Sequence, residues 1–386
     1  MKFQQRKIPA SEKNVIKGFK VALVHEMIIK MGGAERVLKV LEELFPQSVI
    51  KTSIFDKKKC SQFFDQKKIE TSFLQKFYQA KIPLNILRMY MLRAFESFDF
   101  SSYDLVISSS SAFSHAILTN THTKHLCYCH SPARFLWDFY FPILSRENHG
   151  FIKKIKKSIF KAFAYKARIK DVAAAQRSDQ IIANSQNVQK RINKFWRRSC
   201  KVIYPPVEID EFTLSQKNEN YFLIVSALQP FKRIDIAIKA FAKIPKHRLI
   251  IIGEGSAQKI WQKNATSNVE FLGRKSDQTV REYLKNCRAF IFTSDDDFGI
   301  APLEAAACGK PTIAFKSGGA LETIIENQTG IFFNQQTSES LLNGLLKFFE
   351  QENNFNPQKI RKQAEKFSKE NFKNNFLQEV KNLINL

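Results

Sequence analysis

The sequence predicts an α/β protein with two doubly wound domains, and two observations carry this prediction. Short apolar runs typical of buried parallel strands alternate with helical patterns, and the alternation starts again in the second half of the chain. Pro205, Pro206 and the polar run 215–220 separate the two series. The length of 386 residues suits two domains, and a hydrophobic content of 44% is ample for their cores.

The elements of the first half follow from the apolar runs in chain order. A strand at 21–25 leads through a turn at Gly32 and Gly33 into an amphipathic helix at 34–45. Further strands are expected at 49–53, 105–108, 125–129, 180–183 and 202–204. In the second half, strands are expected at 221–225, 249–252, 269–272, 289–292 and 312–315. The boundary between the domains is expected near residue 206, with the ligand site in the cleft between them.

Composition points to anionic partners. Lys and Arg number 61 against 36 Asp and Glu, which gives a formal net charge of +25. Such a surface attracts nucleic acid, an anionic membrane face or phosphorylated substrates. No nucleic-acid-binding motif is present, so nucleic acid is not an expected partner.

The sequence also predicts a cytoplasmic protein without a membrane span. The polar start, residues 1–14, lacks the apolar core of a signal peptide, and no apolar run approaches the roughly 18 residues that cross a bilayer. The six cysteines form no CxxC pair, which predicts reduced thiols. Cys127, Cys129 and His130 lack a fourth ligand and the usual zinc spacing, so no metal is expected there.

The string SDDDFGIAPLEAAACGKP at 294–311 joins two carboxylates to a helix start. Asp296 and Glu304 are eight residues apart and border one strand–loop–helix junction, because 289–292 reads as a strand and 301–307 as a helix. A helix N-terminus offers unpaired N–H groups and roughly half a positive charge, which suits a pyrophosphate. A carboxylate one turn further in can accept hydrogen bonds from sugar hydroxyls.

This string resembles the E-x7-E signature of retaining, nucleotide-sugar-dependent glycosyltransferases of family 4, the group 1 type. These enzymes have the GT-B fold, in which two Rossmann-like domains face a cleft. The resemblance implies that Asp296, which stands in place of the first Glu, contacts the donor sugar and that Glu304 binds the ribose. It implies further donor contacts from backbone groups and close-approaching glycines at Phe298, Gly299, Ile300, Gly318 and Gly319.

The boundary near residue 206, together with the domain roles that the resemblance implies, gives the expected domain limits. They are an acceptor-binding domain at 1–205, a nucleotide-sugar-binding domain at 206–365, and a last helix, within 366–386, that crosses back to the first domain. The family has an Arg and a Lys five residues apart that neutralise the leaving diphosphate. Lys232 matches the Lys, but Ala227 stands where the Arg is expected, so Lys232, helix N-termini and Arg233 are expected to stabilise the phosphate. Gly273 and Arg274 match a loop beside the nucleotide base.

The first domain carries two further matches to the family. Gly32 and Gly33 correspond to a Gly-rich loop that faces the cleft on the acceptor side. The segment CYCHSPARFLWD at 127–138 resembles the CHTPMRYAWD string of bacterial polysaccharide mannosyltransferases. By this resemblance His130 lies near the donor sugar, with Arg134 and Trp137 on the acceptor side. Trp137 fits either a stacking role on a sugar face or a place in the core.

Residues 151–170 contain eight Lys or Arg and no acid, with Phe and Ile interleaved at near-helical spacing. A helix of this composition either lies on an anionic membrane surface or is solvated and packs its Phe residues inward. We expect peripheral membrane association at the inner face of the cell membrane, because enzymes of the resembled family commonly act on lipid-linked acceptors.

The resemblance implies a hexosyltransferase of bacterial surface-polysaccharide assembly, lipopolysaccharide included. The donor is a nucleotide sugar, with GDP-mannose favoured, and the acceptor is a glycan or a lipid-linked saccharide. No metal or other cofactor is expected, since the Asp-rich pattern at 295–297 belongs to the longer signature. The alternatives are a glucosyltransferase, a GT-B epimerase, or a catalytically weak basic protein that binds membrane or nucleic acid.

Overall fold

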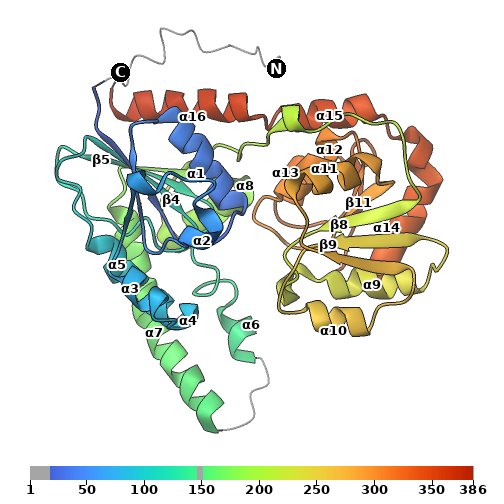
Figure 1. Ribbon diagram of the computed structural model, residues 1–386, viewed down its shortest axis with the longest axis horizontal. Helices are drawn as coiled ribbons and strands as arrows, with labels where there is room; N and C mark the ends of the chain where they lie inside the picture. The colour runs from blue at the N-terminus through green and yellow to red at the C-terminus, as the bar shows by residue number, and fades with distance from the viewer. Residues whose placement is uncertain (1–17, 146–150, 386) are drawn as a thin grey trace. The chain divides into compact units, whose positions relative to one another are not determined.

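The computed structural model describes residues 18–145 and 151–385 (Figure 1). The polar start of the chain, on which the expectation of no signal peptide rests, lies outside the described residues, as do the side chains of 151–153. The chain divides into two compact units. The first unit joins Met1–Tyr204 with Phe372–Leu386, and the second is Pro205–Asn371.

Within the described residues, the first unit is built on a seven-stranded parallel sheet in the order β3-β2-β1-β4-β5-β6-β7. The strand order reverses between the neighbours β1 and β4, which makes their carboxyl ends a topological switch point, the usual place for a ligand in such sheets. The strands are β1 (Val21–His25), β2 (Val49–Thr52), β3 (Ile69–Thr71), β4 (Leu105–Ser110), β5 (Lys124–Cys129), β6 (Gln180–Ala183) and β7 (Lys201–Val202).

Helices cover both faces of this sheet, because successive side chains of a strand point to opposite sides. Val21 and Leu23 pack with α1 and α16, whereas Ala22 and Val24 pack with α5 and α7. The helix α16 contacts β5 through Phe372, whose ring centroid lies 5.6 Å from that of Tyr128. The helices are α1 (Gly33–Leu44), α2 (Lys57–Cys60), α3 (Leu74–Gln79), α4 (Leu84–Leu87), α5 (Met91–Glu96), α6 (Tyr140–Ser145), α7 (Phe151–Gln176), α8 (Gln186–Arg191) and α16 (Lys369–Leu383).

The second unit repeats the arrangement with a six-stranded parallel sheet in the order β10-β9-β8-β11-β12-β13. Its switch point lies between β8 and β11. The strands are β8 (Tyr221–Val225), β9 (Arg248–Ile252), β10 (Val269–Gly273), β11 (Ala289–Phe292), β12 (Thr312–Phe315) and β13 (Gly330–Phe333). The helices are α9 (Ile234–Ala242), α10 (Gln258–Lys263), α11 (Asp277–Asn286), α12 (Ile300–Ala307), α13 (Ala320–Thr323), α14 (Ser338–Gln351) and α15 (Pro357–Glu365).

The predicted α/β architecture with two doubly wound domains is confirmed, and β1, β6, β8, β11 and β12 have the predicted bounds. The N-cap of α11 is Ser276, whose side chain accepts a hydrogen bond from the Thr279 N–H. The strand expected at 202–204 ends earlier, at Val202, shortly before the two prolines. The sequence analysis missed β3 and β13. The first is a three-residue edge strand without an apolar run, and the second is a four-residue strand that follows a turn.

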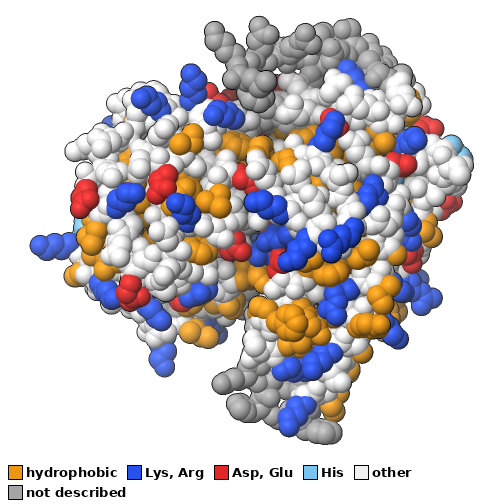
Figure 2. Space-filling model, turned by 180° about the vertical axis from the view of Figure 1, so that it is seen from behind, with side chains coloured by type: hydrophobic (Ala, Val, Ile, Leu, Met, Phe, Trp, Pro, Cys, Tyr) orange, Lys and Arg blue, Asp and Glu red, His pale blue; other side chains and the backbone are white. Residues whose placement is uncertain are grey.

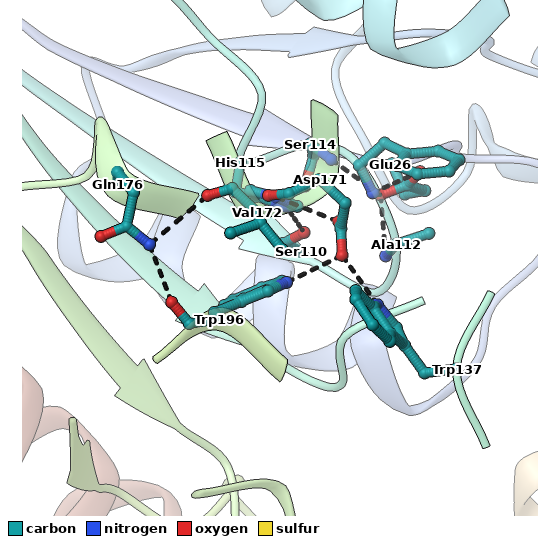
Figure 3. A network of polar contacts seen from close by, with 11 residues as sticks. Glu26, Ser110, Ala112, Ser114, His115, Trp137, Asp171, Val172, Gln176 and Trp196 are labelled. Atoms are coloured by element: carbon teal, nitrogen blue, oxygen red, sulfur yellow. Dashed lines mark hydrogen bonds and ion pairs between the residues drawn. The ribbon is translucent and has the colours of Figure 1, made fainter. Parts of the chain in front are cut away.

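One buried carboxylate fixes the long helix α7 to the core of the first unit (Figure 3). Asp171 is fully buried and accepts hydrogen bonds from the indole N–H of Trp137, at 2.9 Å, and of Trp196, at 2.8 Å. The Nε2 atom of His115 lies 3.4 Å from the Oδ1 atom of Asp171.

Among the described residues, no helix is both long and apolar enough to span a bilayer.

We predict that Asp171→Ala lowers the free energy of unfolding by about 3 kcal/mol, because the indole N–H groups of the buried Trp196 and the half-buried Trp137 lose their acceptor. Urea unfolding followed by tryptophan fluorescence measures the loss. The control is Glu96→Ala in the same unit, which removes a part-exposed ion pair with Arg177 and is expected to cost less than about 1 kcal/mol. Equal losses in the two variants would contradict a central role for Asp171.

Candidate active site

The junction between β11 and α12 in the second unit has the predicted form. Gly299 is the N-cap of α12 and has a φ of 89°, a left-handed conformation that favours glycine. Asp296 lies in the loop before this cap, and Glu304 lies within the helix with its side chain largely buried. The two predicted carboxylates therefore flank a helix start whose backbone N–H groups suit a phosphate.

Lys232 and Asp296 form an ion pair at this junction. The Lys232 Nζ atom lies 2.5 Å from the Asp296 Oδ2 atom, and the two side chains are only 18% and 20% exposed. The hydroxyl of Thr293 donates a hydrogen bond to the carbonyl oxygen of Lys232, at 2.7 Å, which ties the lysine to the end of β11. The structure thus joins two residues that the sequence assigned to the sugar and to the phosphate. A diphosphate bound here must compete with Asp296 for the ammonium.

Arg233 is held by other partners. It adopts a left-handed conformation, with a φ of 53°, at the N-cap of α9. Its guanidinium donates to the carboxylate of Asp235, at 3.2 Å, and to the carbonyl oxygen of Gln336, at 3.3 Å. Ala227 is exposed and offers no charge. Of these positions, Lys232 is therefore the one that brings a cation to Asp296.

The glycines at 318 and 319 allow two loops to pack on one another. A Cβ atom on Gly319 would lie 2.2 Å from the Phe298 Cα atom, and one on Gly318 would lie 2.3 Å from the Asp296 carbonyl oxygen. The Gly319 N–H donates to that same oxygen at 2.9 Å. Phe298 turns its ring inward, 5.6 Å from the ring of Phe367. The structure therefore gathers the predicted donor residues, with Ile300 opening α12, at one edge of the sheet.

A second pair of glycines at this edge escaped the sequence analysis. A Cβ atom on Gly253 would lie 1.8 Å from the Ser226 carbonyl oxygen, and one on Gly255 would lie 2.2 Å from that of Leu228. The Gly253 N–H also donates to the carbonyl of Gly273, the predicted base-contacting residue that ends β10. The sequence pattern that could have revealed this pair is Gly-Glu-Gly, which directly follows the predicted strand at 249–252. Arg274, the next residue predicted to contact the base, is exposed.

In the first unit, three polar side chains form a row at the carboxyl ends of β1, β4 and β5. The Oγ atom of Ser109 lies 3.1 Å from His25 Nδ1 and 2.8 Å from His130 Nε2. Burial, with a contribution from His25, lowers the pKa of His130 to about 3, so this predicted catalytic residue is neutral at physiological pH. His25 and Ser109 were not singled out from sequence, although His25 ends β1 and Ser109 is the last residue but one of β4.

The residues predicted to contact the acceptor saccharide each have their own contacts within the protein. Gly32 precedes α1, and a Cβ atom on it would lie 2.9 Å from a carboxylate oxygen of Glu35. The guanidinium of Arg134 lies over the ring of Phe139, 4.1 Å from its centroid. Trp137 stacks on Phe195 at 4.7 Å and donates its indole N–H to the buried Asp171. These contacts favour the core role for Trp137, because one ring face and the polar edge are used within the protein.

Metal-binding clusters are not found in the described part of the chain. None of its groups of His, Cys, Asp and Glu has three members placed to hold an ion. The six cysteines are all free thiols, and burial raises the pKa of Cys127, Cys287 and Cys308 to about 12. These thiols are therefore protonated at neutral pH and pack as small hydrophobic groups.

Family models match both units. The model described as Glycosyltransferase Family 4 matches residues 31–211, and the model described as Glycosyl transferases group 1 matches residues 207–371. The second match includes the β11–α12 junction. The chain belongs to the family 4, group 1 glycosyltransferases.

Similar proteins agree with this assignment. Over 184 residues the chain is 30% identical to an uncharacterized glycosyltransferase of Methanocaldococcus jannaschii, which covers 46% of this chain and 52% of that protein. It is 24% identical to the alpha-1,3/1,6-mannosyltransferase ALG2 of Schizosaccharomyces pombe over 375 residues, covering 81% of this chain and 70% of that one. The match spans 52% and 59% of the first two relatives, little more than half their length.

The solved structure of Anabaena HepE in complex with UDP has the same fold as this glycosyltransferase. The TM-score is 0.70 at 20% identity, and the match covers 94% of this chain and 100% of HepE. The two parallel sheets and this likeness confirm the predicted two-domain GT-B fold.

We predict that Asp296→Asn raises the affinity for a free nucleoside diphosphate about threefold to tenfold. The substitution removes the ion pair of Lys232, so the lysine ammonium can pair with the phosphates without competition from a carboxylate. Isothermal titration calorimetry with GDP and UDP measures the change. The control is Asp297→Asn, the same substitution one position further on. An equal gain in both variants would show that only the general loss of negative charge matters, and no gain in either would contradict the competition.

Proposed function

We propose that the protein is a retaining transferase that moves a hexose from a nucleotide sugar to a glycan or a lipid-linked saccharide. The observation that carries the proposal is the β11–α12 junction, where Lys232, Asp296 and Glu304 surround the start of a helix. A nucleoside diphosphate needs a cation and N–H donors for its phosphates and an acceptor for its ribose hydroxyls, and this junction offers all three.

The favoured donor is GDP-mannose. Its support is the similarity to alpha-1,3/1,6-mannosyltransferases, which extends over 81% of the chain in the Schizosaccharomyces pombe relative. Solved structures of the same fold hold UDP or UDP-glucose, so glucose transfer from UDP-glucose is the second candidate. Both candidates place a nucleoside diphosphate at the same junction, and they differ only in base and hexose.

In the proposed reaction, the bond between the anomeric carbon and the diphosphate oxygen breaks while the acceptor oxygen bonds to that carbon on the same face. The acceptor hydroxyl passes its proton to the departing phosphate. Lys232 and the N-terminus of α12 stabilise the negative charge that develops on the diphosphate. Glu304 accepts hydrogen bonds from the ribose hydroxyls. The Asp296 carboxylate leaves Lys232 and contacts the donor sugar. The proposal includes no metal ion and no other cofactor.

The proposed place of action is the inner face of the cell membrane, in the assembly of a surface polysaccharide such as lipopolysaccharide. Ile155, Ile159 and Ile169 of α7 are 44%, 52% and 58% exposed, whereas Ala164 and Ala167 on the opposite side are buried. Phe160 and Phe163 pack against the core, as one of the two sequence-based alternatives expected. Apolar patches interspersed with basic side chains are visible on the face of the molecule in Figure 2.

Lysines surround this isoleucine stripe, and the segment 148–170 contains no acid. An apolar stripe flanked by cations fits an anionic lipid surface, which takes the isoleucines into its acyl boundary and pairs its headgroups with the ammonium groups. The exposed basic residues of the described part of α7 are Lys154, Lys156, Lys161, Lys166 and Lys170.

We predict that one of GDP-mannose, UDP-glucose and UDP-N-acetylglucosamine binds with a dissociation constant near the micromolar range, and that Glu304→Ala weakens this binding at least about tenfold. Calorimetry at two salt concentrations measures both. The control is Glu282→Ala on α11, an exposed acid of the same unit. Absence of binding by all three donors, together with salt-sensitive DNA binding, would contradict the proposal and favour a basic binding protein.

We predict that the protein sediments with vesicles that contain phosphatidylglycerol and not with vesicles of phosphatidylcholine alone. The double variant Ile159→Glu/Ile169→Glu is expected to reduce the bound fraction at least about fivefold, because each substitution removes apolar area and adds a repelled charge. Ile260→Glu is the control, since it changes an isoleucine that is 66% exposed in the second unit. Binding that the double variant leaves intact would contradict docking through α7.

A further inference from the structure

A second exposed apolar surface lies on the first unit, beside α7. It consists of outward side chains of α3, α4 and the short 3-10 helix η3 (Arg88–Tyr90), and we call it the α3–α4 patch. Its members are large side chains that are between 36% and 52% exposed, namely Phe73, Phe77, Ile82, Ile86 and Tyr90. Single exposed apolar side chains are ordinary on a protein surface, but five in one short segment indicate a binding surface.

The local structure brings these side chains together. Phe73 and Phe77 are four residues apart at α3, so they share one face of the helix. Ile82, Ile86 and Tyr90 repeat this interval from the turn into α4 and η3. The turn joins the two sets, because the Ile82 N–H donates a hydrogen bond to the Phe77 carbonyl oxygen at 3.1 Å.

The buried side of the same segment packs on the core next to α7. Leu74 of α3 and Leu87 of α4 belong to one apolar cluster with Phe160 and Ala164 of α7. These helices therefore cover the same face of the sheet (Figure 1). The α3–α4 patch and the isoleucine stripe of α7 are carried by one layer of helices within one unit.

The charge of the patch indicates the kind of partner. The segment 71–95 contains no acid. Its cations are Lys76, Lys81, Arg88 and Arg93, and all four are exposed. Two copies of the chain related by a two-fold axis would place these cations against the same cations of the second copy, which opposes self-association. An anionic lipid surface instead pairs its headgroups with the cations and takes the apolar side chains into its acyl boundary.

We propose that the α3–α4 patch is a second membrane-docking surface, which inserts into an anionic lipid bilayer together with α7. The choice of partner rests on the proposed function, which assigns membrane contact to α7 alone. Two contacts on one folded unit bind more tightly than either alone, because docking of the first holds the second close to the surface. A single helix leaves the unit free to rotate about the helix axis, whereas two contacts fix the face that is turned to the membrane.

Quenching of tryptophan fluorescence by brominated lipid tests the insertion of the patch directly. Phe77→Trp is mixed with vesicles of phosphatidylglycerol and dibrominated phosphatidylcholine, and the wild type gives the background of the three native tryptophans. The added tryptophan is expected to lose at least about half of its fluorescence, and to lose none with vesicles of dibrominated phosphatidylcholine alone. Leu346→Trp is the matched control, because Leu346 is 48% exposed on α14 of the second unit. Equal quenching in the two variants would overturn the proposal.

The double variant Phe77→Glu/Ile86→Glu measures how much the patch contributes to binding. It is expected to reduce the fraction bound to phosphatidylglycerol vesicles at least about fivefold with α7 unchanged, because each substitution removes apolar area and adds a repelled charge. The control Ile260→Glu/Leu346→Glu changes two exposed side chains of the second unit and is expected to bind like the wild type. Circular dichroism and the urea unfolding midpoint establish that both variants are folded.

The possible outcomes separate this proposal from the proposed function. If the wild type binds the vesicles but Phe77→Trp is not quenched and Phe77→Glu/Ile86→Glu binds normally, the patch is not a docking surface, and docking through α7 stands. If the wild type does not bind the vesicles, both membrane contacts are wrong, and donor binding in calorimetry still decides the transferase. A lipid-free dimer in sedimentation velocity that Phe77→Glu/Ile86→Glu dissociates would show that a second copy covers the patch, against the proposal.

Discussion

Parallel strand pairing is the constraint on which the polar clusters of both units depend. In a parallel sheet all carboxyl ends lie at one edge, and the reversal of strand order leaves an open position between two neighbouring strands. In the first unit that position lies between β1 and β4, where His25 and Ser109 are register partners. In the second it lies between β8 and β11, and it brings together Lys232 and Asp296, which are 64 residues apart in the chain.

The second unit departs from the family pattern in two positions that affect one another. Ala227 removes a cation that the resemblance led us to expect, and Asp296 replaces a longer acid. The shorter carboxylate forms a close ion pair with Lys232, so the two charges offset each other. Because Arg233 is bound to Asp235 and Gln336, the positive charge available for a diphosphate comes from Lys232. It depends on how readily the ion pair between Lys232 and Asp296 opens. In the proposed site, donor affinity and the geometry around the sugar are therefore coupled through a single ion pair.

Much of this organisation was predictable from the sequence, because the relevant signals are local. Apolar runs placed most strands, and the strand pattern at 289–292 followed by the helical pattern at 301–307 placed a helix start between Asp296 and Glu304. The remaining features depend on partners distant in the chain. No local pattern reveals that Trp137 donates to Asp171, that Arg233 turns to Gln336, or that Gly253 packs on Ser226. The contacts of Ser109 with His25 and His130 were missed for the same reason, since the three residues are far apart in the chain.

The central claim is that the β11–α12 junction binds a nucleoside diphosphate, and a crystal structure of the protein with bound GDP or UDP tests it most directly. The account predicts the diphosphate at the N-terminus of α12, against the backbone of residues 298–300, with the ribose hydroxyls at Glu304 and the Lys232 ammonium turned to the phosphates. A nucleotide bound elsewhere, with the Lys232–Asp296 pair intact and Glu304 away from the ribose, would contradict it.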